Sequence, residues 1–202
     1  MTDATLRERQ ASLARRAIFQ ALLHHLEAGD ADEVPMEDLA NEAGVSRRTL
    51  YRYFPTRSAL LAEAAEWVRS EVLELPIEVG DEGITRSFRL AASRLAGRPG
   101  LARALLRSRT GRSLRGEYRS ARVDAIRRAL AREIPGLSKR EMDRAAPVLT
   151  YLCSSNAWIS IQDESGLDAR HAQAAVEWAL ETLLTRLRDD STPTPDRKGG
   201  KR

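Results

Sequence analysis

The stretch "MEDLANEAGVSRRTLYRYFPTRSALL", residues 36–61, decides the fold, because its apolar residues follow a helical pattern with two sharp breaks. Its first part, 36–43, carries one apolar face, and Gly44 ends that helix after about two turns. Ser46 is a good N-cap for a second short helix, which Pro55 ends because proline denies the preceding residue the helical region. Two short helices joined by a turn that contains glycine predict a helix-turn-helix.

The second of these helices has a positive and aromatic surface. Residues 44–57 hold four arginines and two tyrosines but no acid, although both flanking stretches carry acids freely. On a helix, Leu50 and Phe54 share the inward face because they are four residues apart. The rest of the circumference suits DNA, since arginine reads guanine in the major groove and tyrosine and threonine hydroxyls can bind phosphates.

We therefore expect DNA contacts from Ser46, Arg47, Arg48, Thr49, Tyr51, Arg52, Tyr53 and Arg57. Arg57 falls at the start of the next helix, where free backbone N–H groups favour a phosphate. A carboxylate in this stretch would repel the DNA backbone, which explains why the stretch contains none. The alternative is an ordinary solvated face, because a row of arginines on a helix is usually exposed to water.

At these residues the sequence closely resembles the DNA-binding region of the tetracycline-repressor-like (TetR) family of bacterial regulators, over about residues 10–65. The resemblance implies a homodimer with a helix-turn-helix in each subunit and a divergent C-terminal domain that dimerises and often binds a small molecule. It places Tyr53 and Arg57 among the phosphate contacts and the other polar residues of the helix among contacts to bases or nearby phosphates. Pro35 departs from the family, in which a threonine or serine commonly caps the preceding helix.

Apolar residues recur at helical spacing along the chain, which predicts an all-α protein. We expect a three-helix helix-turn-helix module at 1–60 and a larger C-terminal helical domain for dimerisation and ligand binding at 61–189. The tail, 190–202, is rich in proline, glycine and charge and is predicted to be disordered. Within the C-terminal domain we expect helices at about 81–97, 99–109, 113–134, 139–163 and 168–189.

The stretch 144–161 is apolar on nearly every side, so a domain of this size can hardly cover it alone. We expect this stretch and the last helix to pair with their copies in a four-helix dimer interface, although a purely intramolecular core is the alternative. Pro147 predicts a kink in the first of the two helices. The expected interface residues are Leu149, Leu152, Trp158, Val176, Leu180, Leu183 and Leu187.

A small-molecule effector of unknown identity is implied by the family resemblance. Candidate lining residues are Phe88, Leu95, Leu101, Leu105, Tyr118, Tyr151, Asn156 and Trp158, although apolar residues at this spacing are also typical of a plain core. Residues 86–132 hold fourteen arginines and two acids. That excess is compatible with an anionic effector, such as an acyl-thioester or a fatty acid, and equally with solvated helix faces.

The sequence has no signature of an enzyme: it lacks a G-x-S-x-G elbow, a P-loop and a dinucleotide fingerprint. Its three histidines form no i,i+4 metal pair, and the single Cys153 lies in the most apolar stretch, where a thiol acts as a small hydrophobe. We expect no enzymatic activity, no cofactor and no metal. No apolar stretch approaches the length of a membrane span and no signal peptide is recognisable, so we expect a cytoplasmic protein without a membrane partner.

The leading hypothesis is a dimeric, sequence-specific transcriptional regulator of double-stranded DNA. We expect a repressor that a small-molecule effector releases from a near-palindromic operator; repression rather than activation is the family default. Two alternatives stay open. One is a dimeric DNA-binding regulator or architectural protein with no small-molecule effector, and the other is an enzyme or protein-interaction domain that keeps a vestigial helix-turn-helix.

Overall fold

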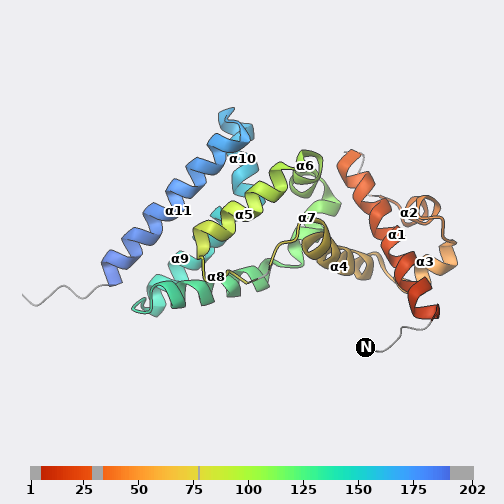
Figure 1. Ribbon diagram of the computed structural model, residues 1–202, viewed down its shortest axis with the longest axis horizontal. Helices are drawn as coiled ribbons and strands as arrows, with labels where there is room; N and C mark the ends of the chain where they lie inside the picture. The colour runs from red at the N-terminus through yellow and green to blue at the C-terminus, as the bar shows by residue number, and fades with distance from the viewer. Residues whose placement is uncertain (1–5, 29–33, 77, 192–202) are drawn as a thin grey trace, which may run out of the picture. The chain divides into compact units, whose positions relative to one another are not determined.

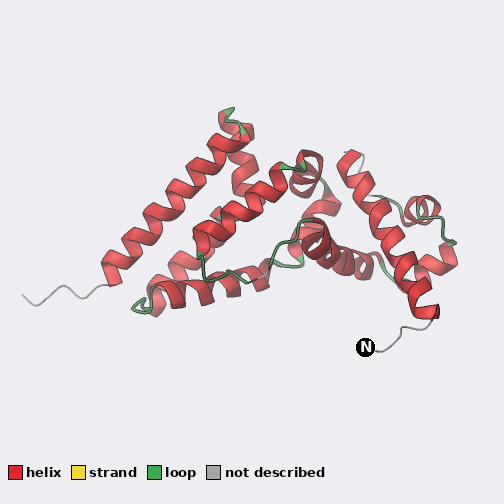
Figure 2. Ribbon diagram, in the orientation of Figure 1, coloured by secondary structure: helices red, strands yellow, loops and turns green. Residues whose placement is uncertain are grey.

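The computed structural model describes residues 6–28, 34–76 and 78–191, and every regular element in this part of the chain is a helix (Figures 1 and 2). The prediction of an all-α protein is confirmed. The chain divides into two compact units, of which unit 1 holds residues 1–76 and 90–120 and unit 2 holds residues 77–89 and 121–202. The predicted C-terminal domain, 61–189, contributes to both units, and its boundary stays a prediction. None of the described helices is both long enough and apolar enough to span a bilayer.

Unit 1 contains the helix-turn-helix. Its helices are α1 (Leu6–Ala28), α2 (Met36–Glu42), α3 (Arg47–Tyr53), α4 (Arg57–Trp67), the second half of α5 (Ile84–Ala96), α6 (Pro99–Arg107) and α7 (Arg109–Gly116). Helix α1 packs against α2 and α6, α2 packs against α3, and α4 packs against α7. Large apolar side chains fill the space between these helices, and the most deeply buried are Ile18, Leu22, Leu26, Leu39, Leu50, Phe54, Leu60 and Leu101.

The helix that begins at Arg57 changes its geometry along its length. It leaves α-helical geometry after Trp67 and continues as a π-helical turn, η1 (Val68–Val72). The amide of Leu73 donates to the carbonyl of Val68 at 2.9 Å, which is the i to i+5 bond of a π-helix. Because such a turn brings residues five apart close together, Val68 and Leu73 are both buried.

Unit 2 is formed by the first turns of α5, by most of α8 (Arg119–Glu133) and by three whole helices. The whole helices are α9 (Lys139–Leu152), α10 (Ser155–Ser165) and α11 (Ala169–Ser191). Two predicted helices were wrong. The predicted 113–134 is divided between α7 and α8, and the predicted 139–163 is divided between α9 and α10, because Ser154 caps a new helix by accepting a hydrogen bond from the amide of Ala157 at 3.3 Å.

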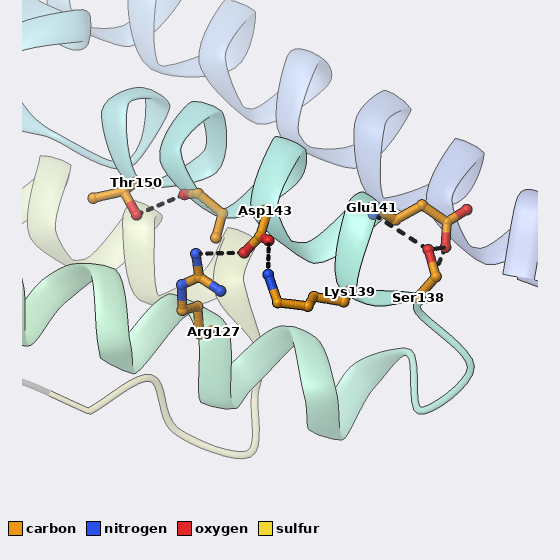
Figure 3. Close-up of polar contacts among 7 residues, drawn as sticks. Arg127, Ser138, Lys139, Glu141, Asp143 and Thr150 are labelled. Carbon is orange, nitrogen blue, oxygen red and sulfur yellow. Dashed lines mark hydrogen bonds and ion pairs between the residues drawn. The ribbon is translucent and has the colours of Figure 1, made fainter.

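The start of α9 is defined by polar contacts (Figure 3). Ser138 and Glu141 form a capping box, and the hydrogen bonds from Ser138 lower the pKa of Glu141. Asp143 accepts from Lys139 at 2.6 Å and from Arg127 of α8 at 2.9 Å, and these two cations lower its pKa. Asp143 is exposed and Glu141 is only partly buried, so these contacts decide where α9 begins more than they stabilise the fold.

At the C-terminal end, α11 extends to Ser191, so the first two residues of the predicted disordered tail, 190–202, are helical. Helix ends are the least certain part of a sequence-based prediction, since one or two residues separate a frayed turn from a formed one. The remainder of the tail, 192–202, lies outside the described residues.

Candidate nucleic-acid interface

The turn between α2 and α3 depends on glycine. Gly44 has φ +66°, in the left-handed region that a side chain disfavours, and the amide of Val45 donates to the carbonyl of Ala40 at 3.0 Å to close the end of α2. Ser46 then caps α3, since its hydroxyl accepts from the amide of Thr49 at 3.1 Å. The structure confirms both local signals of the predicted helix-turn-helix, the turn at Gly44 and the cap at Ser46.

One side of α3 anchors it in the core of unit 1. Leu50 is 1% exposed and Phe54 is 0% exposed, as the spacing predicted. The ring centre of Phe54 lies 5.5 Å from that of Phe19 on α1. The ring centre of Phe19 in turn lies 5.7 Å from that of Trp67 on α4. An isolated helix of seven residues is not stable in water, so this packing is what holds α3 in place.

The opposite side of α3 carries the residues predicted to contact DNA. Ser46, Arg47, Arg48, Tyr51 and Arg52 are exposed, while Thr49 and Tyr53 are partly buried. Within the part of the chain that the structure describes, Arg48 makes no ion pair. The structure therefore brings seven of the eight predicted residues to one short helix and its cap.

Two aromatic rings of α3 lie beside guanidinium groups. Arg47 lies 5.7 Å from the ring centre of Tyr51. Arg52 donates to the hydroxyl of Tyr53 at 3.1 Å, and Arg15 of α1 lies 5.6 Å from the centre of the same ring. These contacts restrict the long side chains to a few orientations before any DNA binds, which lowers the entropy lost on binding.

Residues 44–57 contain no acid, but the fold places an acid of a neighbouring helix beside this surface. Glu37, in the first turn of α2, pairs with Arg47, with 2.6 Å between Oε1 and Nη1. Both side chains are exposed, at 58% and 67% respectively. The sequence could not indicate this pair, because only the packing of α2 against α3 brings the two first turns together.

Pro35 is the N-cap residue of α2, and its ring fixes φ at a value that suits the start of a helix. It has φ −62°, and no side-chain hydrogen bond caps the helix. The hydroxyl that the family pattern would supply at this position is therefore missing, and any phosphate contact it would make is missing with it.

Arg57 is oriented differently from the other predicted residues. Its guanidinium is partly buried in unit 1, where it donates to the backbone carbonyl of Val34 and, at 2.8 Å, to the hydroxyl of Thr110 on α7. Thr110 is a residue that sequence reasoning missed, and its separation of 53 positions left no local signal to find it. The predicted phosphate contact of Arg57 stays a prediction, and it would require this side chain to leave its partners.

The residues predicted for a dimer interface are mostly covered by their own chain. Leu149, Trp158, Val176, Leu180 and Leu187 are at most 6% exposed, Leu152 is partly buried, and Leu183 is 37% exposed. The indole of Trp158 also donates to the carbonyl of Ala169 at 3.0 Å. The physical reason is that α9, α10 and α11 bury one face of each helix among themselves, so only the other faces stay exposed.

The residues predicted for a ligand site are divided between the units. Leu95, Leu101, Leu105 and Tyr118 belong to unit 1, whereas Phe88, Tyr151, Asn156 and Trp158 belong to unit 2. Five of the eight are buried, and Tyr151 is 54% exposed.

Each unit has a cavity, and neither cavity is lined by the predicted residues. The cavity of unit 1 has a volume of about 400 Å³ and lies between α1 and α4. The cavity of unit 2 has a volume of about 350 Å³ and lies beside the start of α5. The described residues include no cluster of side chains arranged to hold a metal ion.

Comparison with known proteins agrees with the geometry of α2 and α3. Residues 18–64 match the family model described as "Bacterial regulatory proteins, tetR family". A search of curated proteins finds no match to the chain. The matched segment runs from the buried part of α1 through the helix-turn-helix to α4, so the family resemblance seen in the sequence is confirmed. Residues 18–64, which lie in unit 1, are therefore similar to the helix-turn-helix domain of TetR-family regulators, and this similarity supports a DNA-binding transcriptional regulator.

Proposed function

We propose that the protein is a dimeric repressor that binds a near-palindromic operator through α3 and leaves it when a small molecule binds. The observation that carries this proposal is the exposed surface of α3, where Arg47, Arg48 and Arg52 surround a capped helix start that is anchored from behind by Leu50 and Phe54. Arginine at the N-terminal end of a helix in the major groove can read guanine through two hydrogen bonds. A regulator of this kind acts by binding rather than by catalysis.

The dimer is supported by apolar side chains that unit 2 leaves uncovered. Trp178 on α11 is 70% exposed, and on α9 Val148 and Tyr151 are 47% and 54% exposed. On α11 an uncharged stripe recurs every three or four residues and is exposed throughout, formed by Ala174, Trp178, Thr182 and Thr185. We propose that a second copy covers these outer faces of α9 and α11, in place of the residues that the chain buries itself. Two recognition helices about 34 Å apart would then meet successive major grooves.

The effector enters the proposal through the family resemblance. A ligand shifts a regulator between two states only if it binds one of them more tightly. The predicted lining residues lie in two units, so we propose no set of contacts for it.

The proposal is tested by selecting DNA from a random pool with the purified chain at 50 and 200 mM salt. We expect one near-palindromic sequence to be enriched. If two arginines of each subunit neutralise phosphates, the logarithmic salt slope is about −3.6 and the affinity falls about a hundredfold between these concentrations. Enrichment of a single half-site would contradict the dimer, and enrichment of no sequence at all would contradict specific DNA binding.

A further inference from the structure

Arg57 and Thr110 join three segments of unit 1 that are distant in the sequence. Arg57 lies in the first turn of α4, and its Nη1 and Nη2 donate to two different acceptors. One is the backbone carbonyl of Val34, which is 3% exposed, and the other is the hydroxyl of Thr110, which is 1% exposed. A planar guanidinium holds two acceptors in a defined relative position, which a single ammonium group cannot do.

The Thr110 end of this bridge is rigid. Ser108 caps α7 by accepting from the amide of Gly111 at 2.9 Å, and its own hydroxyl donates to the carbonyl of Ala104 at 2.8 Å. Gly111 lies so close to α6 that a Cβ would fall 2.2 Å from the carbonyl oxygen of Ala104. The first turn of α7 is therefore held against α6 and gives Arg57 a fixed support.

The Val34 end belongs to the entry into the helix-turn-helix. Val34 directly precedes Pro35, the N-cap of α2, which no side chain caps. Helix α3 follows α2 after the tight turn at Gly44 and packs against it, so the orientation of α2 also orients α3. A contact that holds the carbonyl of Val34 therefore acts on the recognition helix without touching it.

We propose that Arg57 and Thr110 are positioning residues for operator recognition, through which α7 sets the orientation of α2 and α3. The role rests on the proposed binding of α3 to an operator. It differs from the phosphate contact expected for Arg57, because a buried bridge neutralises no phosphate and leaves the salt dependence of binding unchanged.

The test measures operator affinity at 50 and 200 mM salt for wild type, Arg57→Gln, Thr110→Val, Thr110→Ser and the double variant Arg57→Gln/Thr110→Val. We expect Arg57→Gln and Thr110→Val each to weaken binding about tenfold with an unchanged salt slope. The double variant should be no weaker than Arg57→Gln alone, because both changes break one bridge. Thr110→Ser keeps the hydroxyl and should bind like wild type.

Thr150→Val is the matched control, because it removes a hydroxyl that donates to Ala146 at 2.7 Å within α9 of unit 2, and it should leave operator affinity unchanged. A salt slope flattened by about 1.8 per dimer in Arg57→Gln, with normal binding by Thr110→Val, would establish a phosphate contact and overturn the proposal. Equal loss in Thr110→Ser and Thr110→Val would also overturn it, since packing and not the hydroxyl would then matter. If Thr110→Val fails to fold, as judged by circular dichroism, the salt slope of Arg57→Gln and the operator affinity of Thr110→Ser still test the proposal. A wild-type chain that binds no operator contradicts the proposed function itself.

Discussion

Arg47 of α3 and Glu37 of α2 form an ion pair with 2.6 Å between Nη1 and Oε1 at the edge of the recognition surface. The pair is exposed, and such pairs stabilise a fold by only about 0.2–1 kcal/mol. Its importance lies elsewhere: the guanidinium must leave Glu37 before it can bind a base with both of its outer nitrogens.

Glu37→Gln is expected to raise operator affinity, because it removes this competitor for Arg47. The expected gain is about two- to fivefold, the equivalent of one exposed ion pair. Fluorescence anisotropy with the selected operator measures it. Glu71→Gln makes the same change in net charge at a residue that pairs with Arg16 instead, at 3.5 Å, so it serves as the control. An equal gain in both variants would show that net charge alone is responsible.

Arg47→Ala and Arg48→Ala are expected to relax base preference. Each lost bidentate contact to a guanine costs about 1–3 kcal/mol at one operator position and leaves the other positions unchanged. Repeating the selection from random DNA with each variant locates that position. A uniform loss across all sequences would instead assign the arginine to the phosphate backbone.

Two substitutions of Ser46 test the cap of α3 and the charge of its surface separately. Ser46→Ala removes the cap on Thr49 and is expected to lower the free energy of unfolding by about 1 kcal/mol. Ser46→Asp can still cap the helix, so its stability should stay close to wild type, whereas its carboxylate at the DNA surface should weaken operator binding. Thermal unfolding and anisotropy on the same samples check both expectations. Normal binding by Ser46→Asp would place this end of α3 away from the DNA.

Trp178→Glu is expected to convert a dimer into a monomer, because it puts a charge into the proposed interface on α11. Sedimentation equilibrium at micromolar concentration measures the change. Leu13→Glu is the control, since Leu13 on α1 is also exposed, at 68%, but lies outside unit 2. A wild-type chain that sediments as a monomer would refute the interface.

Cys153 is expected to be unreactive in the native state. Burial raises the pKa of its thiol to about 12, although the guanidinium of Arg122 opposes this shift and donates to the Cys153 carbonyl at 2.7 Å. As the pH rises above the usual thiol pKa of 9.0, the unfolded thiol ionises while the folded thiol stays protonated. The contribution of Cys153 to the free energy of unfolding is therefore fully present below pH 9.0 and is lost as the pH rises towards 12. Labelling with a thiol reagent at pH 8 should be slow, and fast after denaturation. Rapid labelling of the folded chain would show an accessible thiolate.

Local signals in the sequence were sufficient wherever neighbouring residues decide the outcome. The glycine turn, the Ser46 cap, the stop before Pro55 and the inward pair Leu50 and Phe54 all depend on residues within a few positions of one another. The break between α9 and α10 was missed despite the serines at 154 and 155, because the apolar residues on either side suggested one continuous helix.

The sequence by itself determined the all-helical class, the helix-turn-helix and the exposed arginines of α3, because helix periodicity and capping act over a few residues. Tertiary structure alone decided that Arg57 lies against Thr110, that Glu37 pairs with Arg47 and which faces of α9 and α11 stay exposed. Each of these depends on which helices pack together, and packing reflects the burial of apolar surface over the whole unit rather than the identity of neighbouring residues.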